Sequence, residues 1–182
     1  MSSFEFHSLP TIHVTKFDAM RRQLTAAVRL WFDDGDPIAI HTLLFASHEI
    51  LHTFFRRRGH NNLLFDNRNV IPAYRKEWAK KLTEAGTFFK HARADPDASM
   101  DFNPHLNEMF LLFSIYALRE MKETLAPEER AFTHWIFVNR PEILIEWAYD
   151  GVPVENIEEL RGVSRKQFLE QALSAYRQLG IK

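Results

Sequence analysis

The chain has 182 residues, which suits one domain with a full hydrophobic core. Hydrophobic residues make up 46% and charged residues 26% of it, a balance typical of globular proteins. The formal net charge of −1 favours neither nucleic acid nor an anionic membrane, so nucleic-acid binding would need a local basic patch. The absence of cysteine excludes disulfides, thiolate zinc sites, iron–sulfur clusters and a cysteine nucleophile.

The N-terminal segment lacks the basic and then apolar layout of a signal peptide. The longest strongly apolar run, residues 109–115, is too short to span a bilayer. We therefore expect a cytoplasmic location and no membrane partner. The sequence leaves the oligomeric state open, and a homo-oligomer stays among the alternatives.

The first half of the chain predicts two long helices. Apolar residues recur at helical spacing from about residue 15 to residue 33. Asp36 and Pro37 then form a cap followed by proline at the first helical position, which predicts a second helix reaching Arg58 and ending at Gly59. A third helical stretch is predicted from near residue 72 towards residue 91, with Gly86 weakening or bending it.

The second half repeats the same signals. Asn103 and Pro104 predict a strongly apolar helix from His105 to about residue 124. Ser164 and Gln167 form a capping-box pattern that opens a C-terminal helix. Further helices are expected at 127–139 and 141–149, with residues 1–13 loosely ordered and residues 150–163 a linker. The prediction is a single all-α domain over residues 1–182, a bundle of about six or seven helices.

The sharpest local motif is His48-Glu49-Ile50-Leu51-His52, which matches H-E-x-x-H. On a zincin helix, two such His bind zinc and the Glu activates the metal-bound water. At 100° per residue, His41 also falls within about 40° of His48 and His52, beside an apolar face. No third ligand is identifiable, so the alternative is that these His line a helix–helix seam. We expect no cofactor, with zinc as the alternative if the motif is a metallohydrolase site.

A second cluster follows the third helical stretch, where Lys90, His91 and Arg93 precede Asp95. A cationic cluster at a helix C-terminus is electrostatically favourable without any further role. The functional alternative is an anion or phosphodiester site, with His91 as acid or base and Lys90 holding negative charge. We also expect Lys90 or His91 to approach the stripe of His41 and His52 and to form one shared polar pocket.

Two weaker clusters complete the candidates. The run at residues 56–58 contains three Arg at a helix end, which is typical of a solvated cap and, alternatively, of a nucleic-acid patch. Asp101, His105 and Glu108 surround the predicted start of a helix. Capping explains most of that pattern, and metal ligation stays an alternative.

Four short segments carry recognisable motifs: residues 40–43, 74–78, 88–92 with 95–96, and 102–104. Together they resemble an uncharacterised bacterial all-helical family with an IHTL / EYRKEW / NFFKHADRDP / FNP pattern. The resemblance spans about residues 24 to 141, and Thr87 stands where that pattern has Asn. It implies an all-helical fold and no particular activity.

A looser resemblance is to HEPN domains, helical bundles that often act as RNases or as nucleotide-modifying partners. Their N-x-x-K-H variant is similar to the segment that ends in Lys90 and His91, with Thr87 in place of Asn. No Arg lies four to six residues before His91. The resemblance implies a HEPN-like bundle and, as an alternative function, a nuclease-type enzyme using His91 and Lys90.

Our leading hypothesis is a cytoplasmic binding or regulatory protein with a polar site that includes His41, Arg93 and Asp95.

Overall fold

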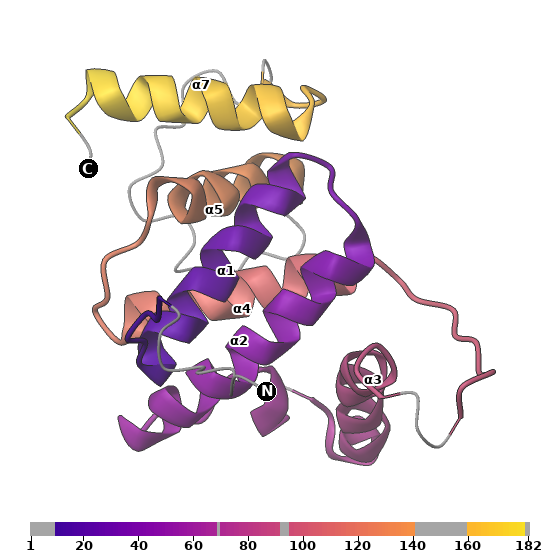
Figure 1. The fold of residues 1–182 in the computed structure, drawn as a ribbon. Helices are drawn as coiled ribbons and strands as arrows, with labels where there is room; N and C mark the ends of the chain where they lie inside the picture. Colours follow the sequence, from indigo (N-terminus) through magenta and orange to yellow (C-terminus); the bar gives the residue numbers. More distant parts are fainter. Residues whose placement is uncertain (1–9, 69, 92–94, 141–159, 181–182) are drawn as a thin grey trace, which may run out of the picture.

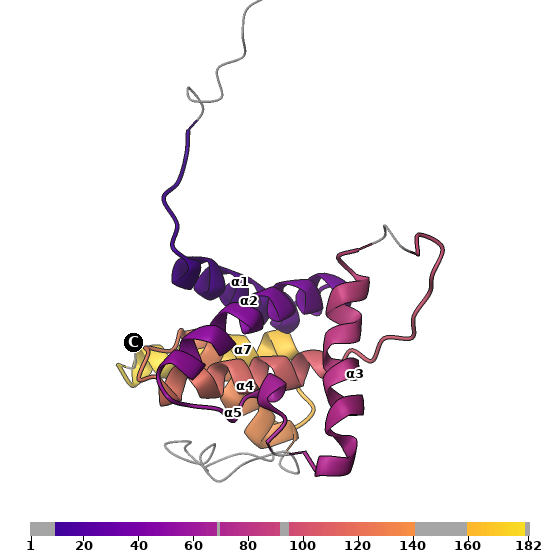
Figure 2. The same ribbon diagram turned by 90° about the horizontal axis from the view of Figure 1, so that it is seen from below.

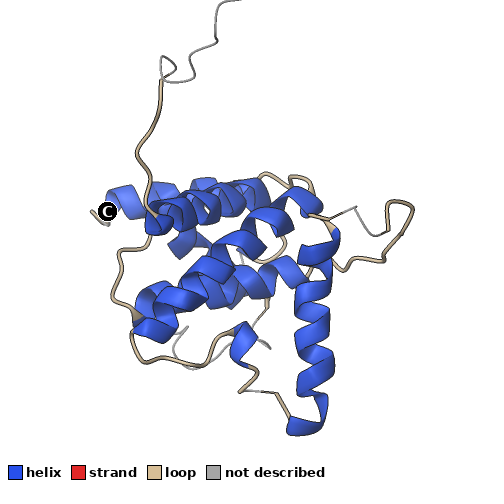
Figure 3. Ribbon diagram, turned by 60° about the horizontal axis from the view of Figure 1, so that its bottom comes forward, coloured by secondary structure: helices blue, strands red, loops and turns tan. Residues whose placement is uncertain are grey.

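The computed structural model describes residues 10–68, 70–91, 95–140 and 160–180. Helical residues make up 68% of this part of the chain, which contains six α-helices, two short 3-10 turns and no strand (Figure 3). The predicted all-α bundle is therefore confirmed. The helix predicted at 141–149, residues 1–9 and most of the predicted linker lie outside the described residues, as does Arg93.

The first two helices begin and end where their local signals predict. α1 spans Lys16–Phe32, and Thr15 and Asp18 form a reciprocal capping box at its start. α2 spans Pro37–Arg57, with the Asp36 carboxylate accepting from the backbone N–H groups of residues 38 and 39. Gly59 follows in the left-handed region at φ 88°, which favours glycine.

The remaining elements follow in chain order. The 3-10 turns η2 and η3 span Leu64–Asp66 and Pro72–Tyr74. α3 spans Arg75–Phe88, α4 spans Leu106–Glu120, α5 spans Pro127–Asn139 and α7 spans Arg165–Gln178.

The end of α4 differs from the prediction. The helix stops at Glu120, about four residues early, because Lys122 adopts a left-handed conformation at φ 58°. The N–H groups of Lys122 and Glu123 then close the helix by bonding to the carbonyls of Arg119 and Leu118. At the C-terminal end, the capping box at Ser164 is present as predicted.

The helices form a bundle to which α3 is attached at one side. Figure 1 shows α1 and α2 lying over α4, with α5 and α7 stacked at the far end from α3. Seen from below, α3 stands upright beside the other helices (Figure 2). Residues 95–105, which precede α4, run along the outside of this flank (Figures 1 and 2).

Gly86 is the point at which α3 packs against α2. α3 continues through Gly86 to Phe88, so the predicted weakening does not end the helix there. A Cβ atom at Gly86 would lie only 2.4 Å from ring atoms of Phe45. The missing side chain is therefore what allows the two helices to approach so closely.

We expect the substitution Gly86→Ala to destabilise the protein. Alanine gains about 1 kcal/mol of helix propensity, but the overlap with the Phe45 ring forces α3 away from α2. Overpacking of this kind costs about 1–3 kcal/mol, so the net free energy of unfolding should fall, as measured by urea denaturation. Thr83→Ala is the matched control, because Thr83 is exposed on the same helix. A more stable Gly86→Ala variant would show that α3 is not held in this position.

Candidate functional site

The three His of α2 each form a hydrogen bond to a side chain from another element. His41 Nδ1 lies 2.9 Å from Asn107 Oδ1, and His48 Nδ1 lies 3.0 Å from Ser114 Oγ, both on α4. His52 Nε2 lies 3.0 Å from the Asp66 carboxylate in η2. The sequence placed the three His on one helix face beside apolar residues, but it did not identify their partners.

The first two of these hydrogen bonds have the same register. His41 and His48 are seven residues apart on α2, and Asn107 and Ser114 are seven residues apart on α4. Partners that advance together along both helices require the two helices to run in the same direction. We refer to these two pairs as the polar rungs between α2 and α4.

Phenylalanine rings surround both rungs. The His41 ring lies 4.9 Å from the ring of Phe102 and 5.3 Å from that of Phe110, measured between centroids. Phe110 also lies 5.1 Å from the ring of His48. Both imidazoles are fully buried, and the Nε2 atom of each has no hydrogen-bond partner among the described residues.

Burial keeps these imidazoles neutral at pH 7. Removal from water lowers the pKa of His48 to about 3, and the nearby His52 contributes in the same direction. Burial also lowers the pKa of His41; the hydrogen bond that His41 donates to Asn107 opposes this effect, and the charge of Lys90 adds to it. Two neutral imidazoles thus line the seam between α2 and α4.

The cluster after α3 is only partly brought to this face. Lys90 Nζ lies 3.3 Å from the Glu49 carboxylate and 4.3 Å from the centroid of the Phe45 ring. Lys90 therefore lies against the helix that carries the histidines. The side chains of His91 and Asp95 are exposed.

The H-E-x-x-H motif lies on a helix, as its metal-binding role requires, but its side chains point to different partners. His48 is bonded to Ser114, His52 to Asp66, and Glu49 to Lys90 on the exposed side. Among the residues that the structure describes, no group of three or more potential ligands is arranged to hold a metal ion.

A pocket of about 560 Å³ lies between α3, the segment 95–105 and the start of α4. Most of the exposed surface of its wall is apolar, although five of its twelve lining residues are polar. It is lined by Trp78, Lys81, Leu82, Glu84, Ala85, Met100, Asp101, Phe102, Asn103, His105, Leu106 and Met109. Phe102 joins the pocket to the histidines, because its ring also contacts His41.

A second polar cluster surrounds Glu108. Its buried carboxylate lies 3.6 Å from Arg140 Nε, 3.5 Å from Arg165 Nη2 and 3.4 Å from His105 Nδ1. Arg165 also stacks on Trp31 at 4.0 Å and so joins α7 to the bundle. The sequence singled out His105 and Glu108, but nothing local indicated the two arginines.

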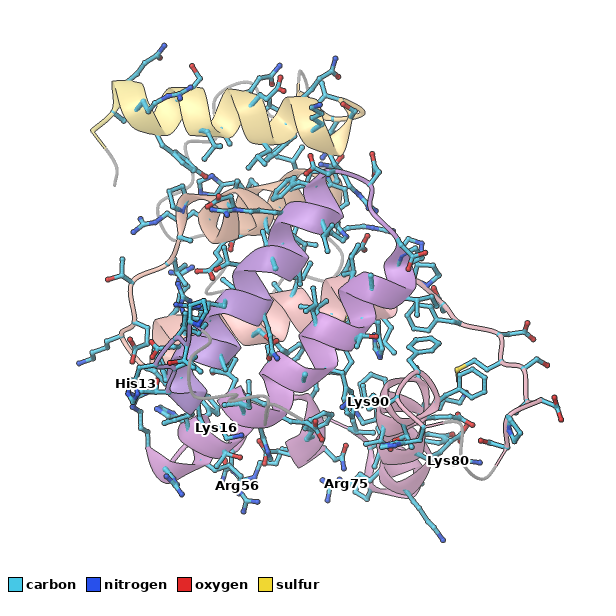
Figure 4. The ribbon with its side chains drawn as sticks, in the orientation of Figure 1. His13, Lys16, Arg56, Arg75, Lys80 and Lys90 are labelled. Carbon is cyan, nitrogen blue, oxygen red and sulfur yellow. The ribbon has the colours of Figure 1, made fainter. Side chains whose placement is uncertain are left out.

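Basic side chains gather at one end of the molecule. Figure 4 labels six of them near its lower edge, from the start of α1, the end of α2 and α3 with the residues that follow it. Two of the six form ion pairs: Arg56 lies 4.0 Å from Asp66, and Lys90 lies 3.3 Å from Glu49. A role in nucleic-acid binding for this end stays a prediction. The six labelled residues are His13, Lys16, Arg56, Arg75, Lys80 and Lys90.

Comparison with known proteins identifies no matching family model, no matching curated protein and no matching solved structure. Within the described residues, α2 is long and apolar enough to cross a membrane by length and composition alone. Its apolar residues Leu44, Leu51 and Phe55 are buried in the bundle, as in the core helix of a soluble protein. The structure is therefore compatible with a soluble protein.

We expect His48 to make the stability of the protein depend on pH. Its pKa is about 3 in the folded chain and about 6.5 in the unfolded chain, so the unfolded state binds the extra proton. The stabilisation is complete above pH 6.5 and is lost as the pH falls, by about 1.4 kcal/mol per unit. Between pH 7.0 and 5.0, His48 should lower the free energy of unfolding of the wild-type protein by about 2 kcal/mol. Urea denaturation at both pH values should show this decrease to be about 2 kcal/mol smaller in the double variant His48→Leu, Ser114→Ala.

The variant Ser114→Ala alone is the control, because it keeps the buried imidazole and should keep the pH dependence. An unchanged pH profile in the double variant would contradict the assignment to His48.

We also expect that no stoichiometric zinc copurifies with the protein. The motif supplies two histidine ligands, His48 and His52, and each is hydrogen-bonded to a different side chain. A zinc site needs at least three protein ligands. Elemental analysis of protein purified without chelator measures this directly. A zinc content near one ion per chain would restore the metallohydrolase hypothesis.

Proposed function

We propose that this chain is a cytoplasmic binding protein that holds a small, largely apolar molecule in the pocket between α3, the segment 95–105 and α4. The observation that carries the proposal is the pocket itself. Its volume of about 560 Å³ falls within the range of small-molecule sites. Trp78, Met100, Phe102 and Met109 give it walls suited to a ring or a short hydrocarbon chain.

The charges at the pocket support a ligand without a strong net charge. Lys81 lies on one side, and Glu84 and Asp101 contribute carboxylates, so positive and negative groups are mixed. A strongly anionic ligand would meet more like charge than opposite charge. The apolar surface therefore accounts for most of the binding energy in this proposal, and the polar groups set orientation.

The nuclease-type alternative has less geometric support. Lys90, which would hold the phosphate, is engaged by Glu49 and lies on the Phe45 ring. His91 is exposed, and none of the residues lining the pocket belongs to that cluster. The HEPN-like relationship and its RNase activity stay predictions that the proposed binding role does not need.

The binding proposal is tested by titrating ¹⁵N-labelled protein with a panel of one-ring and two-ring aromatic fragments. We expect at least one to shift the signals of Trp78, Leu82, Phe102 and Met109, with micromolar to millimolar affinity. Met109→Trp places a larger side chain at a half-buried position that lines the pocket, and should abolish these shifts.

The matched control is Leu179→Trp, which adds the same ring at an exposed position after α7. It should leave binding unchanged. If no fragment perturbs the pocket, or if both tryptophan variants weaken binding equally, the proposed function is wrong.

A further inference from the structure

The hydrogen bonds of Asn107 determine which nitrogen of His41 carries the proton. The Asn107 amide nitrogen donates to the Pro37 carbonyl at 3.0 Å, and a carbonyl can only accept. The amide oxygen therefore faces His41 Nδ1 at 2.9 Å, which makes Nδ1 the donor. A neutral imidazole has one donor and one acceptor, so Nε2 of His41 is left as an acceptor.

This acceptor is buried and has no donor. The His41 side chain is 0% exposed, and Nε2 has no hydrogen-bond partner among the described residues. Leaving a buried acceptor unpaired costs about 1–3 kcal/mol, and native structures contain few such groups. The pairing with Asn107 accounts for Nδ1 of His41 but leaves Nε2 without a donor among the described residues.

One residue, Phe102, connects the pocket to the ring that carries this acceptor. Phe102 lines the pocket, and its ring lies 4.9 Å from the His41 ring. Residues 98–103 form neither helix nor strand, so backbone hydrogen bonds of regular structure do not hold Phe102 in place. Of the four phenylalanine rings next to His41, only that of Phe102 also lines the pocket.

We propose that the ligand of this pocket carries a neutral N–H or O–H donor on its apolar body and donates it to Nε2 of His41 after the Phe102 ring moves aside. This inference rests on the proposed binding function and specifies the chemical class of the ligand. A small phenol, indole or similar ring with one donor has this chemistry. Its apolar part replaces the packing of Phe102, and its donor satisfies the acceptor.

The surroundings exclude a charged donor at this position. Four phenylalanine rings, those of Phe45, Phe89, Phe102 and Phe110, surround His41. An ammonium group placed among them would be desolvated and would meet the positive charge of Lys90, which already acts on His41. A carboxylate would also be disfavoured, because both it and Nε2 are acceptors and neither carries a proton for a hydrogen bond.

His48 does not offer a second such site. Its Nε2 is also unpartnered, but a Ser114 hydroxyl can either donate or accept, so the tautomer of His48 is not fixed. The rings around His48 belong to Phe65 and Phe110, and neither lines the pocket. His48 therefore serves as the matched control position.

The test compares indole with benzofuran, which has the same size and shape but carries oxygen in place of the N–H group. Affinities are measured by NMR titration of the wild-type protein. We expect indole to bind about tenfold more tightly, as one buried hydrogen bond to a neutral acceptor supplies. The ¹⁵N signal of His41 Nε2 should move upfield with indole and stay in place with benzofuran.

Variants locate the effect. In the double variant His41→Leu, Asn107→Leu, which removes both polar partners together, indole and benzofuran should bind equally. In the double variant His48→Leu, Ser114→Ala the preference for indole should persist. The wild-type ¹⁵N measurement decides the question even if the first double variant does not fold.

The possible results separate the two proposals. Equal binding of both probes to the wild-type pocket, with an unmoved His41 signal, overturns the donor proposal and leaves the binding function standing. Absence of binding by both probes and by the wider fragment panel overturns both proposals.

Discussion

The packing of α2 on α4 fixes the register on which the other elements depend. The two polar rungs, His41 with Asn107 and His48 with Ser114, sit at the same offset on both helices. A slip of one turn would separate both pairs and leave four buried polar groups without partners, at a cost of several kcal/mol. Burial of apolar side chains alone would tolerate such a slip better, because the hydrophobic effect is not directional. The polar rungs therefore select one alignment out of several that bury similar area.

The pocket is a consequence of how α3 is attached. α3 approaches α2 most closely where Gly86 meets Phe45, and the contact between Lys90 and Glu49 holds its C-terminal end. The described residues 95–105, which lead to the start of α4, contain turns and no helix. Trp78 on α3 and Met109 on α4 are left facing a shared cavity. Anchoring α3 near one end in this way leaves a cavity between α3 and the start of α4, and residues 100–103 complete its wall.

Local rules predicted the elements because helix signals are local. The caps at Asp36 and Ser164 and the helix at residues 127–139 follow from residues within one turn of each boundary. The end of α4 was predicted too late, because Lys122 is a good helix former, and its left-handed conformation depends on how the following chain leaves the bundle. The histidine face was also predictable from 3.6-residue geometry. The partners of those histidines were not, since they lie 66 residues away for both rungs. The shared seven-residue spacing of His41 with His48 and of Asn107 with Ser114 was the one signal in the sequence that could have paired them.

The two rungs, though alike in geometry, differ in what they leave unsatisfied. Ser114 can rotate its hydroxyl to suit either tautomer, so the pair with His48 can hold the register whichever nitrogen carries the proton. Asn107 has no such freedom, because the Pro37 carbonyl fixes the orientation of its amide. The pair with His41 therefore always leaves a lone pair on Nε2. If register were the only requirement, a second serine at position 107 would satisfy it without that fixed acceptor. Asn107 lies near the N-terminal end of α4, which contributes to the pocket lining. Phe102 also lines the pocket, and its ring contacts the ring of His41. The same hydrogen bond that aligns two helices thus also orients an acceptor, and this acceptor is the group to which the proposed ligand would donate.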